Sequence, residues 1–229
     1  VSKNSLPTAD FVATRFDEKT YRNLIARMFA SDLIEPFSKV HWSIPAILFV
    51  PVVAWFGYEA VTAAPIWQLP LALAAGALMW TFTEYVLHRF LFHIDQGTAF
   101  GRFFYFYTHG IHHSYPDDTY RLVMIPTFSI PLAFLFYWLF ALALPAAFLP
   151  GFFAGFVAGY LVYDYTHYAT HHVRPPKHPK LQWLAAIMKE QRRRHMVHHF
   201  KEHEAGYGVS TELWDVVFRT RISHGSNAS

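Results

Sequence analysis

The sequence contains no cysteine and has little charge. The missing cysteines exclude disulfides, a thiolate-ligated haem, a cysteine-ligated iron–sulfur cluster and a Cys-rich zinc site. Only 15% of the 229 residues are charged, against roughly 25% in an average soluble domain. Lysine and arginine are absent from residues 41–88 and again from 122–173, so both stretches are candidates for membrane insertion. The net charge of +3 is too small to indicate a nucleic-acid partner.

Apolar residues, in contrast, make up 53% of the chain. Four apolar spans can be drawn, each close to the ~20 residues that cross a bilayer: about 42–60, 66–87, 122–145 and 151–168. The links within the first and the second pair are short, which predicts two antiparallel helical hairpins. Several prolines lie inside the spans. They would break the helices of a soluble protein but are tolerated in a membrane, which disfavours a soluble helical fold.

The basic residues predict how these spans are oriented. All 19 lysines and arginines lie in residues 1–40, 89–121 and 174–221, with 6, 3 and 10 in turn. With four spans, these segments share one face, which the positive-inside rule makes cytoplasmic. We therefore expect an integral membrane protein, of the inner membrane if bacterial or of the endoplasmic reticulum if eukaryotic.

The expected organisation has three parts. Residues 1–40 are polar and mixed, lack a cleavable signal peptide, and contain a candidate amphipathic interfacial helix at 20–34. Residues 41–222 form a membrane-embedded domain with a cytosolic cap. Residues 223–229 are expected to be a disordered tail.

Eleven of the fifteen histidines fall into four groups: His88/His93, His109/His112/His113, His167/His171/His172 and His195/His198/His199. Three groups have helical i, i+3 or i, i+4 spacing, which places imidazoles on one helix face. Neutral imidazole is the commonest side-chain metal ligand, and a structural zinc site uses only four ligands. About ten histidines therefore predict two ions. Histidines adjacent in sequence point about 100° apart on a helix and can serve different ions.

Several histidines are less favoured as metal ligands than the others. His88 and His93 can share a site only if their helix ends or bends between them. His172 points away from the His167/His171 stripe, and His203 is expected to be peripheral. His41, His178 and His224 belong to no group and are interpreted as surface residues.

Two carboxylates lie beside the histidines in sequence. Asp164 precedes His167 by one turn near the membrane, so we expect it to orient an imidazole. Glu84 precedes His88 by one turn and has either the same role or that of a solvated carboxylate.

Imidazole ligands suit zinc, iron, copper or nickel. A dinuclear centre at a membrane surface suits dioxygen chemistry on a lipid chain, for which iron is the expected redox metal. Zinc binds such sites more tightly than Fe(II), so purified protein can contain zinc. Because no haem or flavin motif is recognisable, electrons must come from another protein. Arg192–Arg194 are interpreted as contacts for lipid phosphate or an acidic donor, or simply as positive-inside charge.

The chain resembles the fatty acid hydroxylase superfamily of integral-membrane di-iron enzymes, and most closely the fatty acid 2-hydroxylases that act on sphingolipids. The resemblance covers roughly residues 76–222. It is carried by EYVLHRFLFH (84–93), THGIHHSYPDDTYRLVMIP (108–126), YDYTHYATHH (163–172) and RRRHMVHHFKEHEAGYGVSTELWDVVFRT (192–220). It implies an all-α fold in which four transmembrane helices lie below a cytosolic helical cap that holds a dinuclear histidine site.

The resemblance also implies O2-dependent hydroxylation of an acyl chain at C2, as in ceramide. The implied metal ligands are His88, His93, His109, His112, His113, His167, His171, His195, His198 and His199. Tyr163 and Asp164 match a family Tyr-Asp pair near the metals. The HPGG motif of the cytochrome b5 domain found in many eukaryotic relatives is not matched by His178-Pro179-Lys180. The expected electron donor is therefore a separate cytochrome b5-type protein or a ferredoxin with its reductase.

Other functions remain open at this point. A sterol or carotenoid hydroxylase or a desaturase has the same histidine pattern, although RLVMIP and GYGVST-LWD favour a 2-hydroxylase. A zinc-binding membrane protein without catalysis is a further alternative. A metal transporter is disfavoured, because its ligands should lie near the bilayer midplane rather than at one face.

Overall fold

The computed structural model describes residues 28, 29, 31–94 and 97–223, and every regular element in these ranges is helical. Most of the expected N-terminal segment lies outside the described residues, including the larger part of the candidate helix 20–34. Nearly all of the expected tail 223–229 lies outside them as well. The all-α fold predicted from the sequence is therefore confirmed for the part of the chain that the structure covers.

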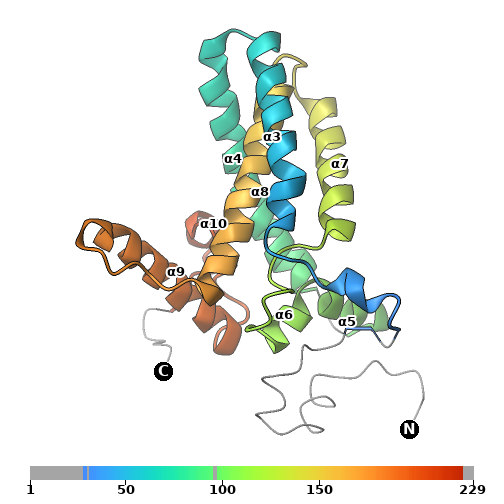
Figure 1. Cartoon of the computed structure of the whole chain (residues 1–229), viewed down its shortest axis with the longest axis vertical. Helices are drawn as coiled ribbons and strands as arrows, with labels where there is room; N and C mark the ends of the chain where they lie inside the picture. The colour runs from blue at the N-terminus through green and yellow to red at the C-terminus, as the bar shows by residue number, and fades with distance from the viewer. Residues whose placement is uncertain (1–27, 30, 95–96, 224–229) are drawn as a thin grey trace, which may run out of the picture.

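Four long helices run side by side: α3 (Ile44–Ala63), α4 (Leu69–Val86), α7 (Pro126–Ala143) and α8 (Leu149–His172) (Figure 1). Short links join α3 to α4 and α7 to α8 at the same end of the bundle, which gives two antiparallel pairs. At the opposite end lie helices α5 (Ala99–Tyr105), α6 (Ile111–Ser114), α9 (Gln182–Phe200) and α10 (Leu213–Val217) (Figure 1). This arrangement places the ends of α4 and α8, and the histidines they carry, next to one another.

Three of the helical stretches are long and apolar enough to cross a membrane: Ile44–Ala63, Ile66–Phe92 and Pro126–Ala143. Many of their apolar side chains point away from the protein, and on α7 Phe134 and Leu142 are 72% and 68% exposed. The fourth predicted span coincides with α8, which does not meet the same criterion, and Asp164 and the histidines at its end lower its mean hydropathy. The third span begins at Pro126 and not at 122, because residues 122–125 are not helical.

Helix α8 packs against α4 and α3 more closely than against α7, its neighbour in sequence. Glycines permit this contact between α4 and α8. A Cβ atom on Gly155 would lie 2.1 Å from the carbonyl oxygen of Leu73, and one on Gly76 would lie 1.9 Å from that of Phe152. The two backbones therefore touch directly, as in membrane helix pairs that place small residues at the interface.

An aromatic core joins α3, α4 and α8 inside the bundle. Phe49 meets Tyr160 edge-on with ring centroids 5.0 Å apart, and Trp80 meets both Phe156 and Tyr160 at 5.2 Å. Edge-to-face pairs of this kind add to the stability gained from burial. The core fixes the register of α8 and thus the height of its histidines.

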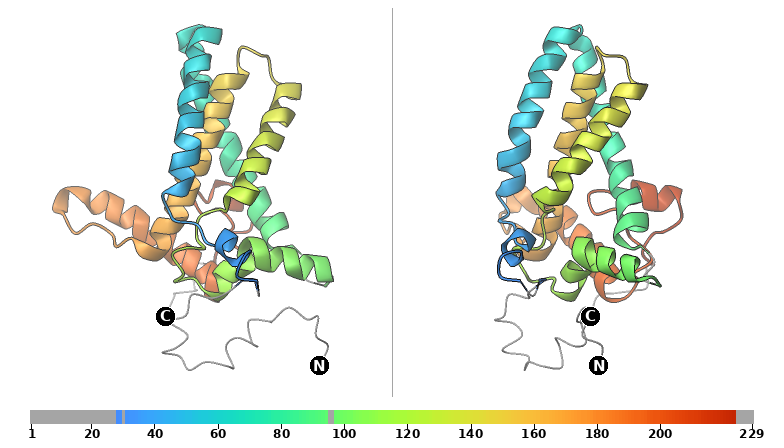
Figure 2. Two further views of the ribbon diagram at one scale, coloured as in Figure 1. Left: turned by 45° about the vertical axis from the view of Figure 1, so that its right-hand side comes forward. Right: turned by 90° about the vertical axis from the view of Figure 1, so that its right-hand side faces the viewer.

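We call the group of elements at the histidine-bearing end of the bundle the cap. It begins where α4 continues without a break into the π-helix η3 (Leu87–Phe92). It then includes α5 (Ala99–Tyr105), the π-helix η4 (Phe106–Gly110) and α6 (Ile111–Ser114). Helix α9 (Gln182–Phe200) starts away from the bundle and returns to it, and the short α10 (Leu213–Val217) follows (Figure 2).

Candidate metal centre

The structure gathers ten histidines at the cap end of the bundle into two groups of five. The first group is His88, His93, His109, His113 and His198, and the second is His112, His167, His171, His195 and His199. Within each group, one ring nitrogen from every residue lies within 4.8 Å of the others. The groups adjoin, since the rings of His113 and His199 stack with centroids 4.1 Å apart. These ten are the histidines that the sequence singled out.

Histidines adjacent in sequence face different groups. On α6, His112 belongs to the second group and His113 to the first. On α9, His198 belongs to the first and His199 to the second. Ring centroids within each adjacent pair are 6.0 Å apart. This division follows from the step of about 100° between neighbours on a helix, and each of the two helices thus contributes to both groups.

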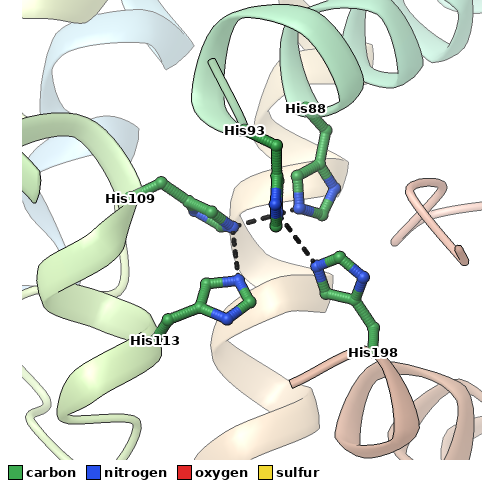
Figure 3. Close-up of side chains that lie close together, drawn as sticks. All are labelled: His88, His93, His109, His113 and His198. Atoms are coloured by element: carbon green, nitrogen blue, oxygen red, sulfur yellow. Dashed lines mark hydrogen bonds between the residues drawn. The ribbon is translucent and has the colours of Figure 1, made fainter. Parts of the chain in front are cut away.

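The π-helix η3 brings His88 and His93 together. The backbone N–H of His93 donates to the carbonyl oxygen of His88 at 3.2 Å, which is the i, i+5 pattern of a π turn. Both rings then point into the first group (Figure 3). The helix thus widens by one residue per turn instead of ending or kinking, and π turns of this kind occur frequently at functional sites.

The Nε2 atoms converge within each group. In the first group, His109 Nε2 lies 3.1 Å from His88 Nε2 and 2.9 Å from His113 Nε2. In the second, His112 Nε2 lies 2.9 Å from His167 Nε2. Ring nitrogens at this separation face the same point in space, as the close-up of the first group shows (Figure 3).

Backbone carbonyls fix the tautomers of two of these histidines. His88 Nδ1 lies 2.5 Å from the carbonyl oxygen of Tyr207, and His198 Nδ1 lies 2.7 Å from that of Ala205. A carbonyl oxygen only accepts, so each Nδ1 carries the proton. The lone pair of each Nε2 therefore points inward, as metal coordination requires.

Burial keeps these imidazoles neutral. It lowers the pKa of His93 to about 3 and that of His198 to about 4. The pKa values of His109, His112 and His195 are also lowered by burial, and further by the neighbouring imidazoles. Neutral rings at physiological pH are the form that binds a metal ion. The set contains no carboxylate, so it suits metals that accept imidazole nitrogen, such as iron and zinc.

Two histidines next to the clustered ones, His172 and His203, remain outside both groups. The ring of His172 lies against Tyr168 at 5.1 Å, and its buried Nε2 has no hydrogen-bond partner among the described residues. His203 approaches His113 with ring centroids 5.9 Å apart but contributes no nitrogen to either group. The sequence analysis also favoured these two residues less than the other ten as metal ligands.

Asp164 lies beside the centre but does not hydrogen-bond to an imidazole, contrary to expectation. It is 1% exposed and accepts the backbone N–H of Met124 at 3.2 Å and the hydroxyl of Tyr160 at 2.9 Å. Asp164 therefore anchors the non-helical residues 122–125 over the site. Tyr163, the other member of the Tyr-Asp pair, stacks on His167 with centroids 5.9 Å apart.

Glu84 fills neither of the roles considered for it. It is 2% exposed and accepts backbone N–H groups from Val209 at 2.6 Å and Ser210 at 2.9 Å, together with the hydroxyl of Ser210. Glu84 therefore anchors the loop that follows α9. Its proximity to His88 in sequence hid this role, because the partner residues lie far along the chain.

Arg121 was not predicted as part of the site. Its guanidinium is buried and pairs with Glu35 at 2.7 Å and with Asp118 at 2.5 Å. Glu35 begins η1 (Glu35–Ser38), which lies next to the loop preceding α7. Arg121 thus holds this loop in place. From the sequence alone, an arginine just before an apolar span is interpreted as one of the positive charges on the cytoplasmic side.

A small cavity of about 50 Å³ borders both histidine groups. Its lining includes His109 and His112, one from each group, and also Tyr163 and Asp164. A second cavity of about 20 Å³ lies deeper in the bundle, against Trp80 and the other aromatic residues. Met124 borders both cavities. Met124 thus lies between the cavity in the bundle interior and the cavity beside the histidines.

Fold and site together define a class: helical proteins with membrane-spanning segments and histidines at one end of the bundle that can hold two metal ions. The particular family follows from comparison with known proteins. The chain belongs to the fatty acid hydroxylase family, whose model matches residues 73–220. The resemblance seen in the sequence is thereby confirmed.

Named relatives are similar over most of this chain. It is 36% identical over 197 residues to dihydroceramide fatty acyl 2-hydroxylase FAH1 of Arabidopsis thaliana, which covers 85% of this chain and 79% of that protein. It is 37% identical over 218 residues to the fatty acid 2-hydroxylase of Mus musculus, covering 86% and 56%. A solved structure, of full-length scs7p with only the hydroxylase domain visible, is 33% identical. It superposes with a TM-score of 0.78 over 86% of this chain and 73% of that one.

Proposed function

We propose that this chain hydroxylates C2 of a fatty acyl group in a ceramide-type sphingolipid. The observation that carries the proposal is the match to a dihydroceramide fatty acyl 2-hydroxylase over 79% of that protein's length, with the ten clustered histidines inside the matching region. The reaction consumes O2, two electrons and two protons. It replaces a C–H bond by C–OH and releases one water.

The ligands of two iron ions would be the two groups of five histidines. The support is geometric, because five ring nitrogens converge in each group. In the first group, backbone carbonyls also fix the tautomers of His88 and His198. When bound, the iron pair would supply the reduction of dioxygen that hydroxylation of an unactivated C–H bond needs. Because zinc binds nitrogen ligands more tightly than Fe(II), purified protein can carry zinc instead.

The acyl chain would reach the centre from the bundle interior, past Met124. Its carboxyl end would then lie at the cavity that touches both groups, which places C2 nearest to the metals. Asp164 positions this wall through the backbone of Met124. Leu122 and Val123, both buried, exclude water on the same side. Tyr163 stacks on His167 and lines the same cavity, where it would contact the substrate.

The membrane arrangement we propose has four spans, with α8 as the fourth. Helix α8 runs beside α3 and α4 through the same slab (Figure 1), and its length of 24 residues is sufficient. Residues 41–222 then form one membrane-embedded domain with its cap on the cytoplasmic face, where all lysines and arginines lie. Electrons would come from a cytochrome b5-type protein or a ferredoxin with its reductase.

Lipid mass spectrometry of cells that express the chain with an electron donor tests the reaction. We expect acyl chains heavier by one oxygen, with fragmentation locating it at C2. The His198→Ala variant should lack this product, whereas His203→Ala, which changes a histidine outside both groups, should retain it. A product lighter by two hydrogens would identify a desaturase instead. Oxidised sterol or carotenoid without 2-hydroxyacyl lipid would refute the substrate.

A further inference from the structure

The loop between α9 and α10 passes directly behind the first histidine group. Two consecutive N–H groups of this loop end on one carboxylate: Tyr207 N–H donates to Asp215 Oδ1 at 3.0 Å, and Gly208 N–H donates to Oδ2 at 2.8 Å. Thr220 adds its hydroxyl to Oδ1 at 2.8 Å. Asp215 is fully buried, so each of these bonds is protected from water.

The next two N–H groups end on a second buried carboxylate. Val209 and Ser210 both donate to Glu84 Oε1, at 2.6 and 2.9 Å, and the Ser210 hydroxyl donates to Oε2. Four consecutive backbone donors, residues 207–210, are thus held by Asp215 of α10 on one side and Glu84 of α4 on the other. These hydrogen bonds hold the loop in place, and in each of them the partner of the carboxylate is a group of the loop rather than an imidazole.

The carbonyl groups of the same loop face the metal centre. Tyr207 accepts the Nδ1 proton of His88, and Ala205 accepts that of His198. Both histidines belong to the first group, one from η3 and one from α9. The second group does not contact this loop in the same way. Its His167 hydrogen-bonds to the backbone of Leu122, and the Nδ1 atoms of His112, His195 and His199 are buried without a hydrogen-bond partner among the described residues.

Two glycines give the loop its shape. Gly206 has φ +72°, a conformation that side chains disfavour. At Gly208, a Cβ atom would lie 2.0 Å from the carbonyl oxygen of Thr211 and 2.9 Å from Asp215 Oδ2. The chain therefore approaches the carboxylate so closely that only glycine fits. The pattern A-G-Y-G, followed seven residues later by Asp215, encodes this contact.

We propose that Asp215 and Glu84 are positioning residues for one of the two metals, the one bound by the first group. They act through the loop: carboxylate to backbone N–H, and backbone carbonyl to the Nδ1 protons of His88 and His198. Such support fixes ring orientation and raises ligand basicity, and its loss typically costs about 10–100-fold in metal affinity. This inference rests on the proposed function, since it assumes that each group binds a metal ion.

The Asp215→Asn variant tests the inference. Asparagine replaces one acceptor oxygen by an NH2 group, which then faces a backbone N–H donor. With detergent-purified full chain titrated with Zn²⁺ in a metal buffer, we expect wild type to bind two ions. In the variant, one of the two should bind about 10–100-fold more weakly. The matched control is Glu212→Gln, an exposed carboxylate three residues away that should keep both affinities.

Double variants assign the weakened ion to a group. Asp215→Asn combined with His88→Ala should lose no more than the one ion, whereas Asp215→Asn combined with His199→Ala should affect both. Equal weakening of both ions in Asp215→Asn alone, with a lowered Tm, would show a merely structural role and overturn the proposal. So would two wild-type affinities.

A milder variant guards against misfolding. Ser210→Ala removes only the hydroxyl bond to Glu84, and it should weaken the same ion by a smaller factor. Unchanged binding in Ser210→Ala, if Asp215→Asn cannot be purified, would count against the proposal. Failure of the proposed function has a different signature: a wild-type chain that binds two ions but makes no 2-hydroxyacyl lipid. Selective loss of one ion in the variant would then still stand.

Discussion

The contact between α4 and α8 gives a sharp prediction, because α4 leads into η3 with histidines of the first group and α8 carries histidines of the second group. His88 continues from α4 through η3, and His167 lies on α8. In a Gly155→Ala variant, the new Cβ atom would lie 2.1 Å from the Leu73 carbonyl oxygen, more than 1 Å short of ordinary van der Waals contact. The obstacle is backbone rather than a flexible side chain, so the helices must move apart.

The size of the effect follows from two magnitudes. Overpacking of a close contact typically costs 1–3 kcal/mol, and about 1.4 kcal/mol changes an equilibrium tenfold. Metal sites tolerate only about ±0.2 Å in ligand distance. A helix shift large enough to relieve the clash at residue 155 therefore also disturbs the histidines. We therefore expect a lower Tm, by several degrees, together with reduced metal content.

Thermal unfolding of the detergent-purified protein and its metal content measure both effects. The matched control is Gly57→Ala on α3, where a Cβ atom would meet nothing within 4 Å. The control should keep its Tm and both metals. If Gly155→Ala behaves like Gly57→Ala, the close contact between α4 and α8 does not exist as described and the reasoning is refuted.

Further variants and conditions test other parts of the site. His112→Ala should lose metal and turnover while His172→Ala keeps both, and equal losses would make His172 a ligand. Asp164→Asn should retain metal but lower turnover, because the Met124 wall loses its anchor; complete metal loss would contradict this role. Arg121→Ala should cost about 3–5 kcal/mol of stability, since it leaves buried carboxylates without their partner, and an unchanged Tm would disprove this. In chelator-treated protein, burial lowers the pKa of His198 from 6.5 to about 4, so the neutral ring stabilises the fold above pH 6.5. That stability should decline as pH falls from about 6.5 to 4, and a constant Tm over this range would contradict it.

The histidine groups could be predicted because their spacing is local. Side chains three or four residues apart on a helix must share a face, and adjacent ones must diverge, whatever the rest of the fold does. The division of His112 from His113 follows from this geometry alone. The π turn that unites His88 with His93 depends on a single extra residue in one turn, for which the sequence carries no distinctive signal.

The close packing of α8 against another helix could have been predicted, although its partner could not. Gly151, Gly155 and Gly159 recur every four residues within an apolar segment, the pattern that lets membrane helices approach closely. This pattern marks α8 as a central helix that packs with a partner. It does not say that the partner is α4, because α7 is the neighbour in sequence and two helices compete for one glycine face.

The buried carboxylates show why closeness to a histidine in sequence did not predict their hydrogen-bond partners. Glu84 and Asp164 each precede a histidine by one turn, a spacing that is equally compatible with a bond to that histidine and with the opposite orientation. In the structure Glu84, Asp164 and Asp215 all accept backbone N–H groups from loops at the histidine-bearing end of the bundle. Each buried N–H group left without an acceptor would cost about 1–3 kcal/mol, so a carboxylate that accepts two of them stabilises its loop. The carboxylates therefore hold the loops, and the loops in turn hold two of the imidazoles through their carbonyl groups.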